Sequence, residues 1–105
     1  MDQELKDRIV GLTKSNRIVL FMKGNKMFPQ CGFSAHVVGM LKQLEVEFDA
    51  HNILADPELR QGLKEISQWP TYPQLYVEGQ LVGGADIVNE LFETGELEKL
   101  LKQES

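Results

Sequence analysis

The sequence predicts an α/β fold in which one mixed sheet of four strands carries helices on both faces. Two observations lead to this prediction. Segments with apolar residues at helical spacing alternate with short apolar runs typical of strands, and only two turn residues separate the last two of these runs. The length of 105 residues suits one domain, which we expect to span residues 1–105.

The first half of the chain alternates between helix and strand patterns. Leucine, isoleucine and valine at helical spacing predict two helices, and two short apolar runs predict strands. The first strand is apolar throughout, as expected of a strand buried on both faces. Glycine, asparagine and proline predict a loop after it. The expected elements are a helix over 2–15, a strand over 18–22, a loop over 23–31, a helix from 32 or 33 to 44, and a strand over 48–53.

A third helix is predicted from its start signal. Asp56 is a favoured N-cap residue, and Pro57 follows it at the first helical position, where the missing N–H of proline costs nothing. Leu59, Leu63 and Ile66 continue the helical spacing, so we expect this helix to end at about Gln68.

The last third of the chain predicts a hairpin followed by two helices. Glu78-Gly79 is a two-residue turn signal between two short apolar runs. Asp86 is expected to cap the next helix, and Gly95 to end it. The expected elements are strands over 75–77 and 80–82, a helix that contains 87–92 and is broken at 94–95, and a short final helix that contains 97–101.

This order is a βαβ half joined through a helix to a ββα half, which is the thioredoxin-like arrangement. The two halves together would form one mixed sheet with helices on both faces. The alternation of elements indicates an α/β protein, but it does not by itself select this topology.

The composition excludes some functions. Asp and Glu number 16 against 11 Lys and Arg, giving a net charge of −5, so a nucleic-acid partner is not expected. The first residues are acidic and no apolar targeting segment follows them, and no apolar run is long enough to span a membrane. We therefore expect a cytoplasmic location and no membrane partner.

Cys31 is the only cysteine, so the chain has no intrachain disulfide and no zinc site built from several cysteines. It lies immediately before a predicted helix, where free N–H groups and the helix dipole favour an anion. A thiolate is the reactive and metal-binding form of cysteine. The competing interpretation is a buried, inert thiol. His36 and His51 have no ligand spacing to each other or to Cys31, so zinc is not expected.

Four sequence words, in this order and at this spacing, make the chain similar to a known family. They are Lys23-Gly24, Cys31-Gly32-Phe33-Ser34, Trp69-Pro70-Thr71-Tyr72-Pro73-Gln74 and Gly83-Gly84-Ala85-Asp86. Over nearly its whole length the chain resembles the monothiol glutaredoxins of the CGFS type. Ser34 stands where dithiol relatives have a second cysteine. A hydroxyl cannot resolve a mixed disulfide, so any turnover needs an outside thiol, for which glutathione is the obvious candidate.

The resemblance implies a glutathione site around a catalytic and metal-ligating Cys31. Lys23 and Arg60 would pair with glutathione carboxylates, and Pro73 would follow a cis peptide bond beside the cysteine. The last of the four words would grip the γ-glutamyl end of glutathione, although Ala85 replaces the cysteine or serine of many relatives. The residues assigned to glutathione are Lys23, Phe33, Arg60, Thr71, Tyr72, Pro73, Gly84, Ala85 and Asp86.

Each assignment has a structural alternative. Lys23 and Arg60 could be ordinary solvated side chains. The tryptophan–proline segment could be a rigid turn next to the core, and the glycine turn before Asp86 could be a plain helix start.

Three functions are compared. The first is a homodimer bridged by a 2Fe-2S cluster, with Cys31 from each chain and two glutathiones as ligands, which delivers clusters to apo iron–sulfur proteins and pairs with BolA-type proteins. Such a cluster normally needs four thiolates, and one chain supplies one. The second is an enzyme that removes glutathione from mixed disulfides through Cys31. The third is a non-catalytic adaptor, which the intact ligand-binding words disfavour.

Overall fold

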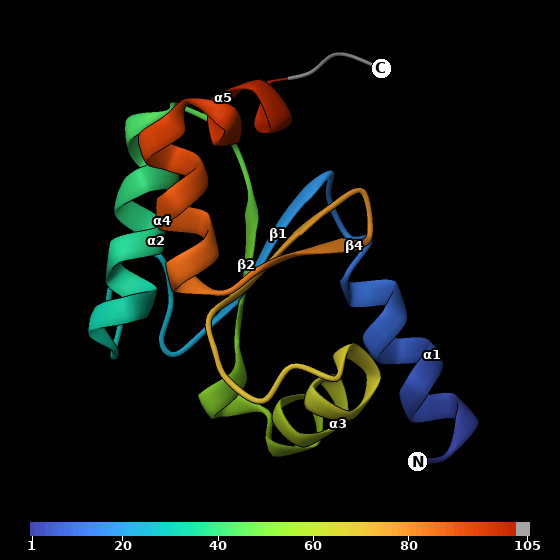
Figure 1. The fold of residues 1–105 in the computed structure, drawn as a ribbon. Helices are drawn as coiled ribbons and strands as arrows, with labels where there is room; N and C mark the ends of the chain where they lie inside the picture. The colour runs from blue at the N-terminus through green and yellow to red at the C-terminus, as the bar shows by residue number, and fades with distance from the viewer. Residues whose placement is uncertain (103–105) are drawn as a thin grey trace.

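A computed structural model describes residues 1–102 and confirms the predicted alternation of helices and strands (Figure 1). All the predicted helices and strands are present, and one short 3₁₀ helix is added. The elements are α1 (Gln3–Leu12), β1 (Ile18–Met22), α2 (Gly32–Gln43), β2 (Asp49–Asn52), η1 (Ile53–Ala55), α3 (Pro57–Ser67), β3 (Gln74–Val77), β4 (Gln80–Gly83), α4 (Ala85–Thr94) and α5 (Glu96–Leu101).

The four strands form one mixed sheet in the order β2-β1-β3-β4. β1 and β2 are parallel, whereas β1 pairs with β3 and β3 pairs with β4 in antiparallel fashion. Because Phe21 pairs with Gln74, the carboxyl end of β1 lies beside the start of β3. Gly83 at the end of β4 pairs with Leu75 near the start of β3, so β4 ends at this same end of the sheet. The end of β1, the start of β3 and the end of β4 therefore lie together at one end of the sheet.

Helices cover both faces of the sheet, as predicted. Figure 1 shows α2 and α4 together on one side and α1 and α3 on the other. The residues of β1 alternate between the two cores: Leu20 and Met22 pack in the core under α2 and α4, and Val19 and Phe21 in the core under α1 and α3. All five positions of β1 are buried. A strand buried on both faces explains the uninterrupted apolar run of its sequence.

Several predicted boundaries differ from the structure by one to three residues, and three of these differences have a local explanation. Helix α1 ends at Leu12, since the next residue, Thr13, turns its hydroxyl back to the Val10 carbonyl oxygen at 2.6 Å. Strand β2 ends at Asn52, whose side chain accepts the Leu54 N–H and so starts η1. The third difference concerns the start of α4.

The prediction that Asp86 caps α4 is wrong. The N-cap is Gly84, which has an extended backbone, and the helix begins at Ala85. Asp86 lies inside the first turn, where its carboxylate suits the positive end of the helix dipole. No side chain caps the helix, so the N–H groups of its first turn are left free. They lie at the end of the sheet where β1 ends and β3 begins.

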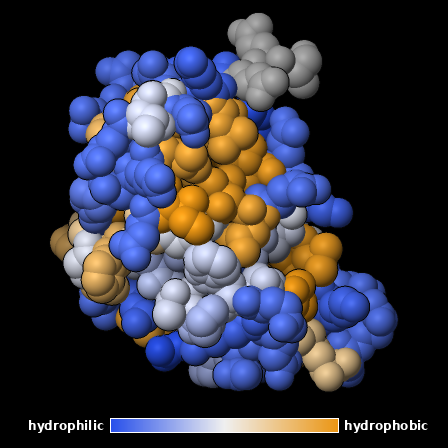
Figure 2. Space-filling view, viewed as in Figure 1, coloured by the Kyte–Doolittle hydropathy of each residue, from blue (hydrophilic) through white to orange (hydrophobic). Residues whose placement is uncertain are grey.

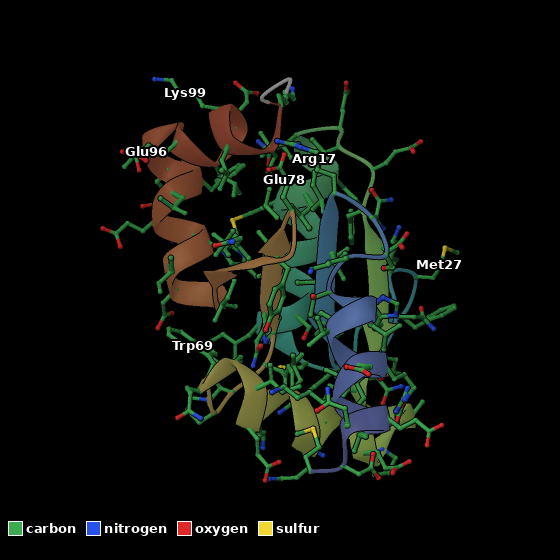
Figure 3. All side chains as sticks on the ribbon, turned by 90° about the vertical axis from the view of Figure 1, so that its right-hand side faces the viewer. Arg17, Met27, Trp69, Glu78, Glu96 and Lys99 are labelled. Atoms are coloured by element: carbon green, nitrogen blue, oxygen red, sulfur yellow. The ribbon has the colours of Figure 1, made fainter. Side chains whose placement is uncertain are left out.

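Arg17 fixes the opposite end of the molecule (Figure 3). Its guanidinium donates to the carbonyl oxygens of Leu100 and Leu101 at the end of α5, and its Nε donates to Glu78 in the β3–β4 turn at 3.2 Å. This fork satisfies carbonyls that the end of a helix leaves free.

The space-filling view shows apolar side chains gathered over β4 and the neighbouring parts of α4 and α5 (Figure 2). The partly buried residues Val82, Leu91, Phe92 and Leu100, which belong to β4, α4 and α5, pack against the core. Among residues 1–102, no helix has the length and hydropathy needed to cross a bilayer.

The structure confirms the predicted N-cap of α3 and yields a test of stability. Asp56 accepts the Leu59 N–H at 3.1 Å and pairs with Arg8 at 3.0 Å. We expect Asp56→Ala to lower the free energy of unfolding by about 1 kcal/mol at pH 7. Asp56→Asn keeps a capping oxygen for the Leu59 N–H but loses the charge and one acceptor for Arg8, so it should cost less than Asp56→Ala. Urea unfolding of the three proteins measures the difference.

The same residue predicts a pH dependence. The hydrogen bond from Arg8, followed by that from the Leu59 N–H, holds the pKa of the Asp56 carboxyl below its ordinary value. The unfolded chain therefore takes up this proton at higher pH than the folded chain, and the stabilisation present above about pH 4 is lost as the pH falls. The stability gap between wild type and Asp56→Asn should narrow toward pH 3; a gap that stays constant from pH 7 to pH 3 contradicts this.

Candidate functional site

One cleft lies at the end of the sheet where β1 and β4 end and β3 begins. It is lined by every residue that the sequence analysis assigned to the site. It has a volume of about 360 Å³, within the range of small-molecule sites. It lies between the end of β1, the start of α2, one face of α3, the loop before β3 and the start of α4. The lining residues are Lys23, Cys31, Phe33, Arg60, Lys64, Trp69, Pro70, Thr71, Tyr72, Pro73, Gly84, Ala85, Asp86 and Ile87.

Cys31 occupies the N-cap position of α2, as predicted, and its side chain is partly exposed in the cleft. The backbone N–H of Ser34 is the main cause that lowers the pKa of the Cys31 thiol. The Phe33 N–H, the Lys23 charge and the Ser34 hydroxyl add to it, and partial burial opposes it. The first turn of the helix thus favours the thiolate. Cys31 is therefore not the buried, inert thiol of the competing interpretation.

Lys23 follows the last residue of β1 and is held against the start of α2. Its backbone N–H donates to the Ser34 hydroxyl at 3.1 Å, and its carbonyl accepts the Gln30 N–H at 2.9 Å. Gly24 follows with a φ of +93°, and a Cβ there would lie 2.5 Å from the Phe28 carbonyl oxygen. Only glycine fits this point, where the loop folds back toward the cysteine.

The loop between Gly24 and Pro29 is pinned by side chains. Asn25 accepts the N–H groups of Met27 and Phe28 at 3.0 and 2.8 Å. Lys26 donates to the Phe48 carbonyl and lies over the Phe48 ring, 4.2 Å from its centre. Met27 and Phe28 themselves remain largely exposed, and Met27 projects from the β2 side of the molecule (Figure 3).

The loop before β3 forms one wall of the cleft. The Tyr72–Pro73 peptide bond is cis, as the resemblance implied. Tyr72 donates its hydroxyl to the Arg60 carbonyl at 2.8 Å, which ties the loop to α3. Burial raises the pKa of this hydroxyl, so it stays neutral and keeps its proton to donate.

Gln74 stabilises the same wall through side-chain hydrogen bonds. Its fully buried amide donates to the carbonyls of Trp69 and Thr71, both at 3.2 Å, and accepts the Tyr76 hydroxyl at 2.9 Å. The sequence includes Gln74 in a recognisable word but gives no sign of this role. Without these bonds two carbonyls of the wall would lose their donors.

The opposite wall is the turn into α4. A Cβ at Gly84 would lie 3.1 Å from Trp69 Nε1 and 3.3 Å from the Pro73 carbonyl oxygen, so glycine lets this turn pack closely against the first wall. Figure 3 places Trp69 between the ends of α3 and α4. Its Nε1 is buried and has no hydrogen-bond partner among residues 1–102.

The cleft is electropositive although the chain as a whole is acidic. Lys23, Arg60 and Lys64 line it against a single carboxylate, Asp86. Lys64 was missed from the sequence, and its position four residues after Arg60 on α3 was the available signal, because such residues share a helix face. Three cations in one concave site favour a ligand with carboxylates.

The two histidines lie outside the cleft. His36 Nε2 is 2.8 Å from the Asn89 side-chain oxygen, and His51 Nε2 is 3.2 Å from the Ser15 hydroxyl. Within residues 1–102, no three His, Cys, Asp or Glu side chains are grouped closely enough to hold a metal ion.

Comparisons with known proteins agree with this geometry. A family model described as Glutaredoxin matches residues 18–82. The chain is 59% identical over 97 residues to a probable monothiol glutaredoxin 2 of Rickettsia typhi, covering 92% of this chain and 87% of that protein. The solution structure of reduced apo GrxS14 from poplar is 53% identical, with a TM-score of 0.78, and the match covers 90% of this chain and 87% of that one.

A buckwheat glutaredoxin–glutathione complex has a TM-score of 0.82, and the match covers 98% of this chain and 96% of that one. Its sequence identity is 22%, so this likeness shows the shared fold alone.

The bracing of the wall by Gln74 can be tested. We expect Gln74→Leu to lower the free energy of unfolding by about 1–3 kcal/mol, because it leaves buried polar groups without partners. Urea unfolding measures this, with Gln80→Leu as the matched control on the exposed start of β4. The control should change stability by less than about 0.5 kcal/mol. Equal effects of the two substitutions would contradict the role given to Gln74.

Proposed function

The chain belongs to the glutaredoxin family, among its monothiol members, and we propose that it holds glutathione beside Cys31 and carries a 2Fe-2S cluster between two copies of itself. The observation that carries the proposal is one partly exposed cysteine, with a lowered thiol pKa, at the mouth of an electropositive cleft. A single thiolate beside a peptide-sized site is suited to share a ligand set with a bound thiol.

The cleft fits glutathione by charge and shape. Glutathione is a tripeptide with a carboxylate at each end and a thiol at its centre. We assign one carboxylate to Lys23 and Arg60, with Lys64 adding to the field. We assign the other to the N–H groups at the start of α4, which no side chain caps. Thr71–Pro73 would lie along the peptide, which brings its thiol next to Cys31.

The donor count supports a shared cluster. A 2Fe-2S cluster normally takes four thiolates. Each chain supplies Cys31 and, through its cleft, one glutathione thiolate, so two chains complete the set. The cluster is cargo in this proposal. The chain's own residues hold the glutathione and keep the Cys31 sulfur ionised and open toward the second chain.

A cluster held by one side chain and one free tripeptide from each copy should exchange readily. We therefore propose apo iron–sulfur proteins as recipients and BolA-type proteins as partners. A cytoplasmic location accords with a site that depends on reduced glutathione.

The same thiolate supports a second candidate, the removal of glutathione from proteins. Cys31 would attack the glutathione sulfur of a mixed disulfide, releasing the protein thiolate and forming a Cys31–glutathione disulfide. A second glutathione thiolate would then attack that disulfide, forming oxidised glutathione and freeing Cys31. Ser34 has no thiol for the alternative intramolecular step.

Anaerobic reconstitution with iron, sulfide and glutathione distinguishes the two functions. The carrier function predicts a visible cluster absorbance that is lost when glutathione is omitted and in Cys31→Ser. A colourless monomer that rapidly reduces glutathione mixed disulfides would contradict it and favour the enzyme.

The cleft assignments have their own test. We expect Lys23→Ala and Arg60→Ala each to weaken glutathione binding about five- to tenfold, since each removes a charge-assisted contact to a carboxylate. Titration calorimetry on the ligand-free chain measures this. Lys99→Ala, an exposed cation on α5, is the matched control and should leave affinity unchanged. Unchanged affinity in both cleft variants would remove these assignments.

A further inference from the structure

Tyr72 carries a buried hydroxyl that joins two parts of the cleft. Its side chain is only 6% exposed and packs in the core under α1 and α3. The hydroxyl donates to the Arg60 carbonyl oxygen on α3 at 2.8 Å. A phenyl ring would fill the same core space without burying a polar atom, and burial of a polar atom is unfavourable unless it is hydrogen-bonded. Core packing therefore does not account for the hydroxyl, whereas its bond to α3 does.

The two segments that this bond joins are those assigned to contact glutathione at the same time. Thr71–Pro73 would lie along the tripeptide, and Arg60 would meet the carboxylate at its glycine end. Both segments line the cleft. Because the Tyr72 hydroxyl bonds to the backbone of Arg60, it fixes the distance between α3 and the loop that carries Tyr72 itself. A ligand that spans both segments depends on this distance, since supporting hydrogen bonds hold binding groups in their productive geometry.

The Arg60 guanidinium has no ion-pair partner among residues 1–102, so it is available to a ligand. The ion pairs in this part of the chain use other cations. Arg17, for example, is held in place by Glu78 and by two carbonyl oxygens at the end of α5. Since no carboxylate fixes the guanidinium of Arg60, its place in the cleft depends on the backbone that the Tyr72 hydroxyl holds.

We propose that Tyr72 is a positioning residue for the glycine end of glutathione, and that its hydroxyl places Arg60 so that the cleft selects a ligand with a free carboxylate there. This deepens the proposed function and rests on it, because the carboxylate belongs to the glutathione that the cleft is proposed to hold. Lys23 and Lys64 add positive charge in the same cleft. An amide or an ester at the glycine carboxyl would leave these cations without an anion.

Tyr76 provides a comparison within the same core. Its hydroxyl is also hydrogen-bonded, but it donates to the Gln74 side-chain oxygen at 2.9 Å and not to Arg60. Burial raises the pKa of both tyrosine hydroxyls, so both keep their protons and can donate. A loss of selectivity that follows removal of the Tyr72 hydroxyl alone would therefore reflect its bond to Arg60, and not the loss of a buried hydroxyl in general.

Titration calorimetry of the ligand-free chain with glutathione and with its glycine monoethyl ester tests the proposal. The ester keeps the thiol and the γ-glutamyl end, and it replaces the charged glycine carboxylate by a neutral group. We expect the wild type to bind glutathione at least about tenfold more tightly than the ester. Tyr72→Phe should reduce this preference about threefold or more, because it weakens the binding of glutathione and leaves that of the ester nearly unchanged.

Tyr76→Phe is the matched control and should lower stability while the preference keeps its wild-type value. Arg60→Ala should itself reduce the preference, and adding Tyr72→Phe should change it no further, since the hydroxyl acts through Arg60. A wild-type preference in Tyr72→Phe, or an equal loss in Tyr76→Phe, overturns the proposal. A wild type that binds no glutathione refutes the proposed function and this proposal with it. The expected preferences together with failed cluster reconstitution would refute the carrier function and leave the role of Tyr72 intact.

Discussion

The site depends on one interaction, the stabilisation of a sulfur anion by the first turn of α2. Cys31 is the N-cap of that helix, and the Ser34 and Phe33 N–H groups act on its sulfur. A helix N-terminus offers N–H groups that no other backbone atom uses, so it can hold a negative charge without a neighbouring cation. The Lys23 charge adds to this effect but is not its main cause.

The sheet brings the rest of the cleft to this sulfur. Because β1 and β3 run antiparallel, the end of β1 and the start of β3 lie side by side at one end of the sheet, and β4 also ends there. Lys23, Pro73 and Gly84 each follow or precede one of these strand ends and so converge, although they are distant in sequence. Buried cores on both faces pack against the sheet whose strand ends bring these three residues together.

The sequence predicted what local patterns encode. Asp56 and Pro57 start α3, the apolar run of β1 is buried throughout, and Cys31 lies at a helix start, because each feature depends on neighbouring residues. The motif words also named cleft residues correctly as neighbours in space. The start of α4 was misplaced because Asp86 is a good capping residue by type, whereas the chain uses the extended backbone of Gly84. Contacts between distant segments left no local pattern: the Gln74 amide behind the wall, the Tyr72 hydroxyl on α3 and the Lys23 bond to Ser34.

The proposed function has two chains sharing one four-thiolate cluster, because each chain has a single cysteine; native mass spectrometry of the anaerobically reconstituted protein tests this proposal most directly. We expect one dominant species that contains two chains, one 2Fe-2S cluster and two glutathiones. A cluster retained on a single chain, or on two chains without glutathione, would contradict the proposed ligand set.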